Sequence, residues 1–328
     1  MVDLNIKLPE SFFQDEERDG YLVTKEKKEL WAVQLDLLNE IDQVCRKYHL
    51  RYIIDYGTLL GAVRHKGFIP WDMDVDLSMP REDYEKLKRI AVTEFKEPYF
   101  FQNIDTDSTI DFSITRLRRS DTTFFHPGAV MFNFKYNQGI FLDIFPFDNV
   151  PSNDQNMIAP IVQKCEQLLH CAEISARKPL IQIGNRYIVF MFQYLYFRLR
   201  YGSSAKQFKR LDDYAKSFEY SGYYGSLVTE GSTCRPKQWF EETVDLPFEN
   251  LLLRAPKAYD EMLKTYYGDY MTPVVIEFTA PYFSASRCYN DVLKDKAFCQ
   301  ELFKKTYPSI SLGQVFESLW VGLKRKIH

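Results

Sequence analysis

Three aspartates alternate with apolar residues in the segment Trp71-Asp-Met-Asp-Val-Asp-Leu77. On a β-strand, every second side chain points to the same face, so Asp72, Asp74 and Asp76 would crowd together while the apolar residues face inward. Carboxylates this close repel one another unless a cation neutralises them or a proton is shared. Their oxygens suit Mg²⁺ or Mn²⁺, which proteins often hold together with substrate phosphates. An acidic surface loop is the alternative, because a short DxD motif is weak evidence alone.

A further carboxylate, Asp143, lies in the apolar run Gly139-Ile-Phe-Leu-Asp-Ile-Phe-Pro146. A charge in such a strand costs free energy unless it is paired or bound to a metal. We therefore expect Asp143 either to join the acidic site as a third ligand or to form a buried ion pair with an arginine. The sequence leaves both possibilities open.

Residues suited to phosphate binding come just before the acidic segment. The run Gly57-Thr-Leu-Leu-Gly61 lies between a predicted strand and a short predicted helix, where backbone N–H groups can receive a phosphate. It is not a P-loop, because no Gly-Lys-Ser/Thr follows at the right spacing. Arg64 and Lys66 then add cations. We therefore expect Gly57, Thr58, Arg64 and Lys66 to contact substrate, together with Asp72.

Two arginines in Ile114-Thr-Arg-Leu-Arg-Arg119 add a second candidate phosphate contact. Arg116 and Arg118 share one face of a strand, so their guanidinium groups can form a fork that grips a diphosphate. Solvated cations at a strand edge are an equal alternative. Aromatic residues make up 16% of the chain, and some could box a quaternary ammonium by cation–π contacts. The sequence does not say which ones.

The elements that must position these residues are predicted from the sequence pattern, with helices mostly early in the chain and short strands later. The apolar periodicity predicts an amphipathic helix over 25–49, and Ser78 is the expected cap of a second helix whose buried face is Tyr84, Leu87, Ala91 and Phe95. Strands are predicted at 51–56, 71–77, 112–117, 122–125 and 139–145, and a short helix at 58–64. This order indicates an α+β fold.

The character of the chain changes after residue 155. Residues 156–210 carry nine Lys or Arg residues against two acids. They are also rich in apolar and aromatic residues that are compatible with helices, so we expect a helical insertion. Near the C-terminus, Leu312–Leu323 has an apolar helical face with Trp320, and Lys324-Arg-Lys326 follows. An apolar stripe with a basic end is typical of a helix in a membrane interface. Packing of both segments on the catalytic domain is the alternative.

Composition excludes several classes of protein. The chain has 328 residues, 27% of them charged, and a net charge of −3, which gives no case for nucleic-acid binding. Six cysteines form no CxxC pair, so neither structural zinc nor a disulfide framework is expected. We see no secretory signal and no segment long enough to span a membrane, so we expect a cytoplasmic protein at the inner face of a membrane.

Several motifs together carry a family resemblance. The run YIIDYGTLLGAVRHKGFIPWDMDVDLSMPREDYEKL and the later NQGIFLDIFPFDNVP resemble the LicD family of bacterial phosphocholine transferases, which is related to fukutin and the fukutin-related protein. The segments Leu246–Glu249, Ala255–Asp260 and Tyr267–Tyr270 are similar to the family's C-terminal pattern. The resemblance covers roughly residues 25–275.

The resemblance implies a nucleotidyltransferase fold like that of DNA polymerase β. Gly57 and Thr58 fall where that fold has its Gly-Ser motif, and Asp74 and Asp76 match its metal-binding pair. Asp143 matches the later carboxylate, which makes Asp74, Asp76 and Asp143 the expected catalytic and metal-binding residues. We expect a nucleotidyltransferase-like core over 1–155, a helical insertion over 156–224, a return to the core over 225–280 and a helical segment over 281–328.

The resemblance also implies an activity, namely Mg²⁺- or Mn²⁺-dependent transfer of phosphocholine from CDP-choline to a hydroxyl of a cell-surface glycan precursor. Two alternatives remain open. One is transfer of another group, such as glycerol or ribitol phosphate, or of a nucleotide, by the same acids. The other is a non-catalytic module that binds glycan or a membrane surface. Crowded carboxylates argue against the second, because without a cation they only destabilise the fold.

Overall fold

The computed structural model describes residues 1–126, 129, 131–132, 134–180, 186–229, 234–275 and 281–306. Helices in this part of the chain are α1 (Lys25–Lys47), α2 (Tyr56–Arg64), α3 (Arg81–Glu94), α4 (Gln155–Ala176), α5 (Arg186–Tyr201), α6 (Ser204–Ala215), α7 (Tyr259–Tyr267), α8 (Tyr289–Lys294) and α9 (Lys296–Thr306), with 3-10 turns at Glu10–Phe13 and Lys237–Phe240. Strands are β1 (Glu16–Arg18), β2 (Tyr21–Val23), β3 (Ile53–Ile54), β4 (Asp76–Pro80), β5 (Tyr99–Gln102), β6 (Thr115–Arg119), β7 (Thr123–Phe125), β8 (Ile140–Val150), β9 (Tyr223–Gly225), β10 (Cys234–Pro236), β11 (Thr243–Phe248), β12 (Leu251–Pro256) and β13 (Tyr282–Ser284). The predicted mixture of helices and strands is confirmed.

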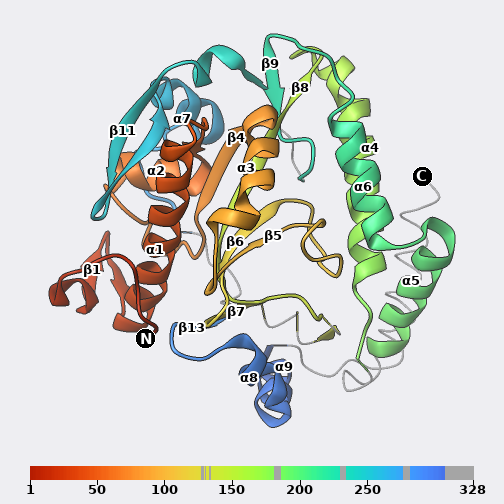
Figure 1. The fold of residues 1–328 in the computed structure, drawn as a ribbon, viewed down its shortest axis with the longest axis horizontal. Coiled ribbons are helices and arrows are strands. Elements are labelled where there is room, and N and C mark those ends of the chain that lie inside the picture. Colours follow the sequence, from red (N-terminus) through yellow and green to blue (C-terminus); the bar gives the residue numbers. More distant parts are fainter. Residues whose placement is uncertain are drawn as a thin grey trace.

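The described residues form a mixed seven-stranded sheet around β8, the long strand that crosses the middle of the molecule (Figure 1). On one side β8 runs parallel to β4, which in turn pairs antiparallel with β3. On its other side β8 pairs first with β6 and then with β9. The two acidic segments of the sequence therefore become neighbouring strands, although more than 60 residues separate them.

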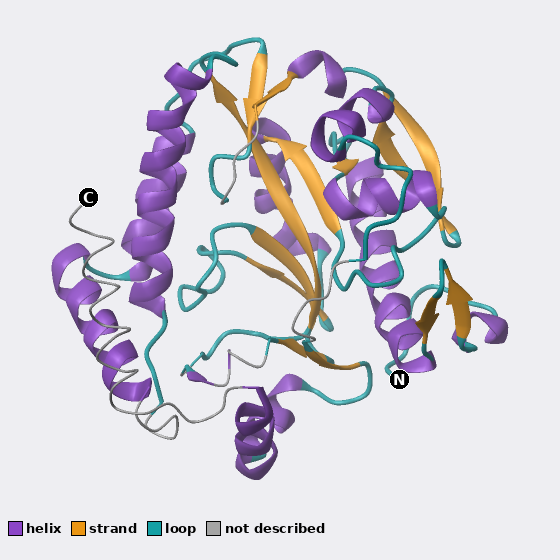
Figure 2. Cartoon of the chain, turned by 180° about the vertical axis from the view of Figure 1, so that it is seen from behind, coloured by secondary structure: helices purple, strands orange, loops and turns teal. Residues whose placement is uncertain are grey.

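Helices α1 and α3 pack on this sheet, where α1 contacts β6 and β8 while α3 contacts β4 and β8. Helix α1 begins at Thr24, whose side chain accepts a hydrogen bond from the Lys27 N–H, and it buries a full stripe of apolar residues. Figure 2 shows the helices and the sheet from behind. Because α1 and α3 pack on these strands, they fix the positions of β4 and β8.

The predicted boundary between the acidic strand and the next helix is wrong. Strand β4 begins only at Asp76, so Asp72 and Asp74 precede it, and helix α3 begins at Arg81 rather than near Ser78. Ser78 lies inside the strand and donates its hydroxyl to Asp55 at 2.6 Å, so it does not cap the helix. The buried helical face of Tyr84, Leu87, Ala91 and Phe95 is confirmed.

The described residues of the basic segment are mostly helical, as expected. Helices α4 and α6 pack along each other and α5 packs against α4, which Figures 1 and 2 show at one side of the sheet. A second apolar cluster lies between α4 and α6, with Cys165, Leu169, Phe208 and Leu211 buried. The division of the chain into domains stays a prediction.

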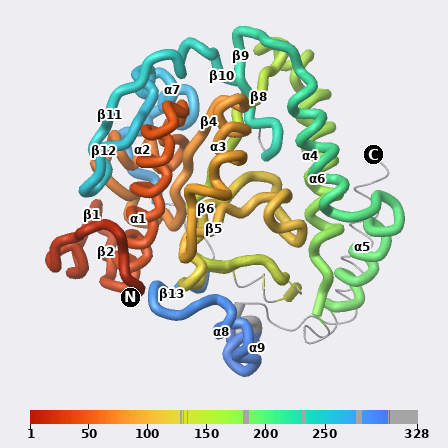
Figure 3. The backbone as a smooth tube through the Cα atoms, in the orientation of Figure 1, coloured from red at the N-terminus to blue at the C-terminus, as the bar shows by residue number. Residues whose placement is uncertain are grey.

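The C-terminal part that the structure describes returns to the core. Strand β13 pairs antiparallel with β7, and the Val2 N–H donates to the Ala285 carbonyl at 2.7 Å, so the N-terminus lies beside β13 (Figure 3). The predicted helix over Leu312–Leu323 lies outside the described residues. Among the helices that are described, none combines the length and the apolar character needed to cross a membrane.

Candidate functional site

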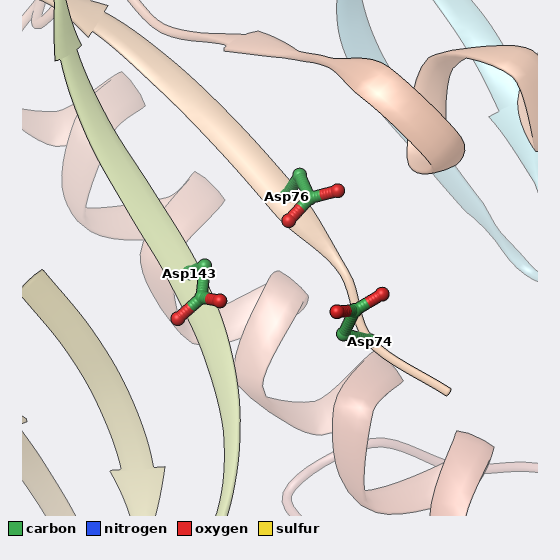
Figure 4. A group of neighbouring side chains, drawn as sticks. All are labelled: Asp74, Asp76 and Asp143. Atoms are coloured by element: carbon green, nitrogen blue, oxygen red, sulfur yellow. The ribbon is translucent and has the colours of Figure 1, made fainter. Parts of the chain in front are cut away.

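Asp74, Asp76 and Asp143 lie together. Asp76 at the start of β4 is in register with Asp143 on β8, and Asp74 comes two residues before β4. One carboxylate oxygen from each lies within 4.8 Å of those from the other two. Figure 4 shows the three side chains, with Asp143 on one strand and Asp74 and Asp76 on the segment beside it. The sequence therefore identified a group of carboxylates that the fold does bring together.

The electrostatics of this group favour a bound cation. Burial, followed by the Asp74 charge, raises the pKa of Asp76 well above its usual value. The Asp74 side chain is partly exposed to solvent. Partial desolvation by the surrounding protein, followed by the Asp72 charge, raises the pKa of its carboxyl to about 7. Burial also raises the pKa of Asp143, although Arg116 acts in the opposite direction. Acids held so close in the ionised form are stabilised by positive charge.

Helix α2 fixes the position of Asp76. The Asp76 N–H donates to the Thr58 hydroxyl oxygen at 2.8 Å, and the Asp76 carbonyl accepts from the Asp55 N–H at 3.0 Å. Asp55 is also the N-cap of α2, accepting from the Tyr56 N–H at 2.8 Å. Gly57 and Thr58 therefore lie in the first turn of α2, which begins at Tyr56, two residues before the predicted start at residue 58.

A buried ion pair between Arg235 and Asp55 stabilises the N-terminus of α2. Arg235 on β10 donates to Asp55 at 2.9 Å, and both side chains are fully buried. The rings of Tyr56, Phe147 and Tyr266 each lie within 5 Å of the Arg235 guanidinium carbon. The N-terminus of α2 is thus tied to the sheet through side chains that are distant in the sequence.

Asp72 packs against Gly57. A Cβ atom at position 57 would lie 2.4 Å from the Asp72 Oδ2 atom, so a larger residue there would displace this carboxylate. Asp72 neighbours Asp74 but is not one of the three closely grouped acids. The expectation that all three alternating aspartates share one strand face is therefore wrong, because the strand starts after two of them.

Arg116 and Arg118 both line a cavity of about 320 Å³. Arg116 donates to Asp143 at 2.7 Å, and its guanidinium lies between the rings of Phe112 and Phe141, at 4.1 and 4.2 Å. The Arg–carboxylate pair is thus present, and Asp143 also lies beside the other two acids. Its role as a metal ligand stays a prediction.

Arg118 is a buried cation in the middle of the sheet. It is 1% exposed and donates to the Gly139 carbonyl at 2.6 Å and to Gln102. Within the described ranges it forms no ion pair, and burial with the Arg116 charge lowers its pKa to about 9. The alternative of solvated cations at a strand edge is wrong, since β6 lies between β5 and β8.

The other two predicted cations are placed differently. Arg64 donates to the Tyr270 carbonyl at 3.0 Å and lies 5.9 Å from the Trp71 ring. Lys66 is exposed, and its carbonyl accepts from the Glu249 N–H at 2.7 Å. In the part of the chain that the structure describes, no contact joins either side chain to the three aspartates.

Three residues near the acids were not predicted. Burial lowers the pKa of Lys27 to about 8, against the effect of the Asp72 charge. Burial and then Asp55 and Asp76 raise the pKa of Tyr267, and His126 lies within electrostatic reach of Asp74. Tyr267 belongs to one of the motifs that carry the family resemblance, so the sequence could have indicated a place near the site. No sequence pattern indicated this for Lys27 or His126.

Comparisons with known proteins show what this chain is similar to. Residues 49–165 match the family model LicD/FKTN/FKRP, nucleotidyltransferase domain, and this range contains all three aspartates. The lipopolysaccharide cholinephosphotransferase LicD of Haemophilus influenzae is 28% identical over 257 residues, which cover 74% of this chain and 91% of that protein.

Two further similarities are shorter. The human ribitol 5-phosphate transferase FKRP is 30% identical over 77 residues, covering 24% of this chain and 16% of that protein. The uncharacterized protein RT0683 of Rickettsia typhi is 40% identical over 72 residues, or 22% of each chain. Residues 49–165 therefore contain a LicD-type domain, and the resemblance seen in the sequence motifs is confirmed.

Proposed function

We propose that this protein transfers a substituted phosphate group, with phosphocholine from CDP-choline as the first candidate, to a hydroxyl of a cell-surface glycan precursor. Its named relatives are phosphotransferases, and the chain is an enzyme of that class. The observation that carries the proposal is the group of Asp74, Asp76 and Asp143 beside the arginine-lined cavity.

A nucleotidyltransferase fold like that of DNA polymerase β is part of the proposal. Supporting it, the N-terminal turn of α2 lies against the strand that starts at Asp76, and β4 lies parallel to the strand that carries Asp143. The core would comprise residues 1–155 and 225–280, with 156–224 inserted and 281–328 appended.

Asp74, Asp76 and Asp143 offer an all-oxygen donor set that suits Mg²⁺ or Mn²⁺. An ion bound there would neutralise the donor diphosphate and stabilise the charge on the leaving phosphate. Gly57 and Thr58 would present the N-terminus of α2 to the donor, and Arg118 would donate to a phosphate oxygen. Arg116 would hold Asp143 in place, while Asp143 helps to take the proton of the acceptor hydroxyl. The acceptor oxygen then bonds to the distal phosphorus as the bond to CMP breaks.

Ribitol or glycerol phosphate is the second candidate group, because the similarity to a ribitol 5-phosphate transferase covers part of the same region. A panel of CDP-choline, CDP-ethanolamine, CDP-glycerol and CDP-ribitol separates these candidates. The true donor should raise the melting temperature with Mg²⁺, since a ligand of the folded state stabilises it, and should release CMP when acceptor is added. Failure of every donor in both measurements would overturn the proposal.

The acceptor is proposed to be lipid-linked, so that the enzyme works at the inner face of an anionic membrane. Ile188, Phe192, Leu195 and Leu199 follow helical spacing along α5, and all are exposed. Arg198, Arg200, Lys206, Lys209 and Arg210 are exposed close by in the sequence. Apolar and basic side chains in this arrangement suit an anionic lipid surface.

A further inference from the structure

Asp55 is a further carboxylate beside the acidic site. Burial is the main cause of the raised pKa of Asp76, and the Asp55 charge adds to it after those of the other nearby acids. Both carboxylate oxygens of Asp55 are already bonded. Oδ1 accepts from the Tyr56 N–H at 2.8 Å, while Oδ2 accepts from the Ser78 hydroxyl at 2.6 Å and from Arg235 at 2.9 Å. Asp55 therefore has a structural role next to acids that are grouped closely enough to hold an ion.

The main chain of Asp55 bears on the position of Asp76. The Asp55 N–H donates to the Asp76 carbonyl at 3.0 Å, and the Asp76 N–H donates to the Thr58 hydroxyl oxygen at 2.8 Å. The Asp55 carbonyl also accepts from the Leu59 N–H at 3.1 Å, a bond of the first turn of α2. Both polar main-chain groups of Asp76 are thus bonded to residues 55–58. Fixing Asp55 therefore fixes the direction in which the Asp76 side chain leaves the strand.

The cation that balances Asp55 comes from a distant part of the chain. Arg235 lies on β10, which follows the helices α4–α6 and pairs with β9, and β9 pairs with β8 (Figure 3). This position is outside the range 49–165 that matches the family model. The side chains of Arg235 and Asp55 are both fully buried. The pair thus joins the segment after the helices to the centre of the acidic site.

Aromatic rings fix the orientation of the Arg235 guanidinium. Its central carbon lies 4.8 Å from the ring centroid of Tyr56 and 4.9 Å from those of Phe147 and Tyr266. These rings belong to α2, β8 and α7, so one side chain contacts three elements besides its own strand. A planar guanidinium can pack on ring faces and donate in its own plane at the same time, which a lysine ammonium cannot do.

A fully buried ion pair adds little stability in itself. The cost of removing both charges from water offsets most of their attraction, and apolar replacements of such pairs are often equally stable. The pair is therefore better explained by what it positions. We propose, resting on the function proposed above, that Arg235 is a positioning residue of the acidic site, which through Asp55 fixes the N-terminal turn of α2 and the main chain of Asp76. It also keeps the Asp55 carboxylate neutralised and apart from the ion-binding acids.

Calorimetric titration of the full chain with Mn²⁺ tests this without relying on turnover. We expect Arg235→Gln to raise the Mn²⁺ dissociation constant about tenfold or more, as loss of a residue that orients a metal ligand does. Reduced stability alone would lower the fraction of protein that binds, not the affinity of the folded protein. CMP release from CDP-choline should fall by a similar factor. Arg235→Lys keeps the charge beside Asp55 but not the planar packing, so its affinity should lie between those of wild type and Arg235→Gln.

Arg81→Gln is the matched control. Arg81 forms another ion pair with a buried aspartate, donating to Asp148 on β8 at 2.7 and 2.8 Å. Asp148 lies toward the end of β8 away from Asp143. Urea denaturation of Arg81→Gln should show a loss of stability like that of Arg235→Gln. Its Mn²⁺ dissociation constant should nevertheless stay within about twofold of wild type.

A double variant keeps the test decisive if Arg235→Gln does not fold. Arg235→Met combined with Asp55→Asn removes both charges, and asparagine still caps α2. We expect it to resist urea about as well as wild type but to bind Mn²⁺ severalfold more weakly. Unchanged Mn²⁺ affinity in this double variant would overturn the positioning role, and so would equal losses of affinity in Arg235→Gln and Arg81→Gln.

The outcomes also separate this inference from the proposed function. If wild type releases CMP from CDP-choline and the Arg235 variants do so equally fast with unchanged Mn²⁺ affinity, the transfer stands and the positioning role is wrong. If no CDP-linked donor yields CMP but Mn²⁺ affinity depends on Arg235, the positioning role stands and the proposed transfer fails.

Discussion

Three carboxylates within 4.8 Å store repulsion in the metal-free protein. The pKa of Asp74 is raised from 3.8 to about 7, so its stabilising contribution is complete below pH 4 and is lost as the pH rises through 7. We expect Asp74→Asn to raise the melting temperature of the metal-free protein at pH 8 by a few degrees. The gain stays near 1 kcal/mol because Asp74 is partly solvated.

The same substitution should abolish activity. Losing a metal ligand removes several kcal/mol of transition-state stabilisation, so CMP release should fall by about a hundredfold or more in Asp74→Asn and Asp76→Asn. Asp213→Asn, an exposed aspartate on α6, is the control and should match wild type in both measurements. Near-normal turnover by either site variant would contradict the metal assignment.

Binding of a divalent cation at this site should depend on pH. Metal ligands must be deprotonated, and the pKa of about 7 at Asp74 means that a cation competes with a proton below that pH. We expect millimolar Mn²⁺ to raise the melting temperature more at pH 8 than at pH 6, with Mg²⁺ in the same direction. A shift that is equal at both pH values, or that survives in Asp76→Asn, would place the cation elsewhere.

At this scale the sequence predicted acids better than their neighbours. Asp74 and Asp76 are two residues apart, and Asp143 stands out as a charge in an apolar run, so each had a local signal. Lys27 and His126 approach the site from elements that are distant along the chain, and no spacing rule connects them to it. Arg64 and Lys66 were chosen only for being close in sequence, which does not fix where long side chains point.

The Asp76 N–H at the start of strand β4 donates a hydrogen bond to the Thr58 hydroxyl oxygen on helix α2, and Thr58 is 3% exposed. Thr58→Val keeps the shape but leaves that N–H unsatisfied, which should cost about 1–3 kcal/mol of unfolding free energy. Because Asp76 then loses its anchor, CMP release should fall as well. Thr58→Ser restores the hydroxyl and should recover most of both. Urea denaturation and turnover measure the two effects, and a Val variant as active as wild type would remove Thr58 from the site.

Element types were predictable here and element boundaries were not. The apolar stripe of α1 and the face of α3 gave clear helical periods, and both helices formed as expected. The alternation over 71–77 looked like a strand, but pairing with β3 and β8 begins only at Asp76 or beyond. Strand limits depend on partners that are remote in sequence, and a single segment does not encode them.

Over the whole molecule, composition predicted the helical segment after residue 155 but not its placement. The contacts of α4 with α5 and α6, and the return of β13 to β7, join parts of the chain that no local pattern connects. The cavity lined by Arg116, Phe134 and Arg177 forms for the same reason, because β6, a loop and the end of α4 must first be brought together. The sequence contained the residue types of this cavity without indicating which of them would meet.

The exposed face of α5 should bind an anionic membrane. Phe192 is 54% exposed and Leu199 is 87% exposed, so the helix presents apolar surface that the rest of the described chain does not cover. Each Lys or Arg near an anionic lipid surface adds about 1 kcal/mol, so binding should weaken as salt rises. We expect the full chain to sediment with phosphatidylglycerol vesicles at low salt and to be released at high salt. Replacing Phe192 and Leu199 with serine should reduce sedimentation severalfold, whereas Val92→Ser, an equally exposed apolar residue on α3, should not. A wild-type protein that stays in the supernatant at low salt would contradict the membrane contact, and unchanged sedimentation of the double variant would assign it to another surface.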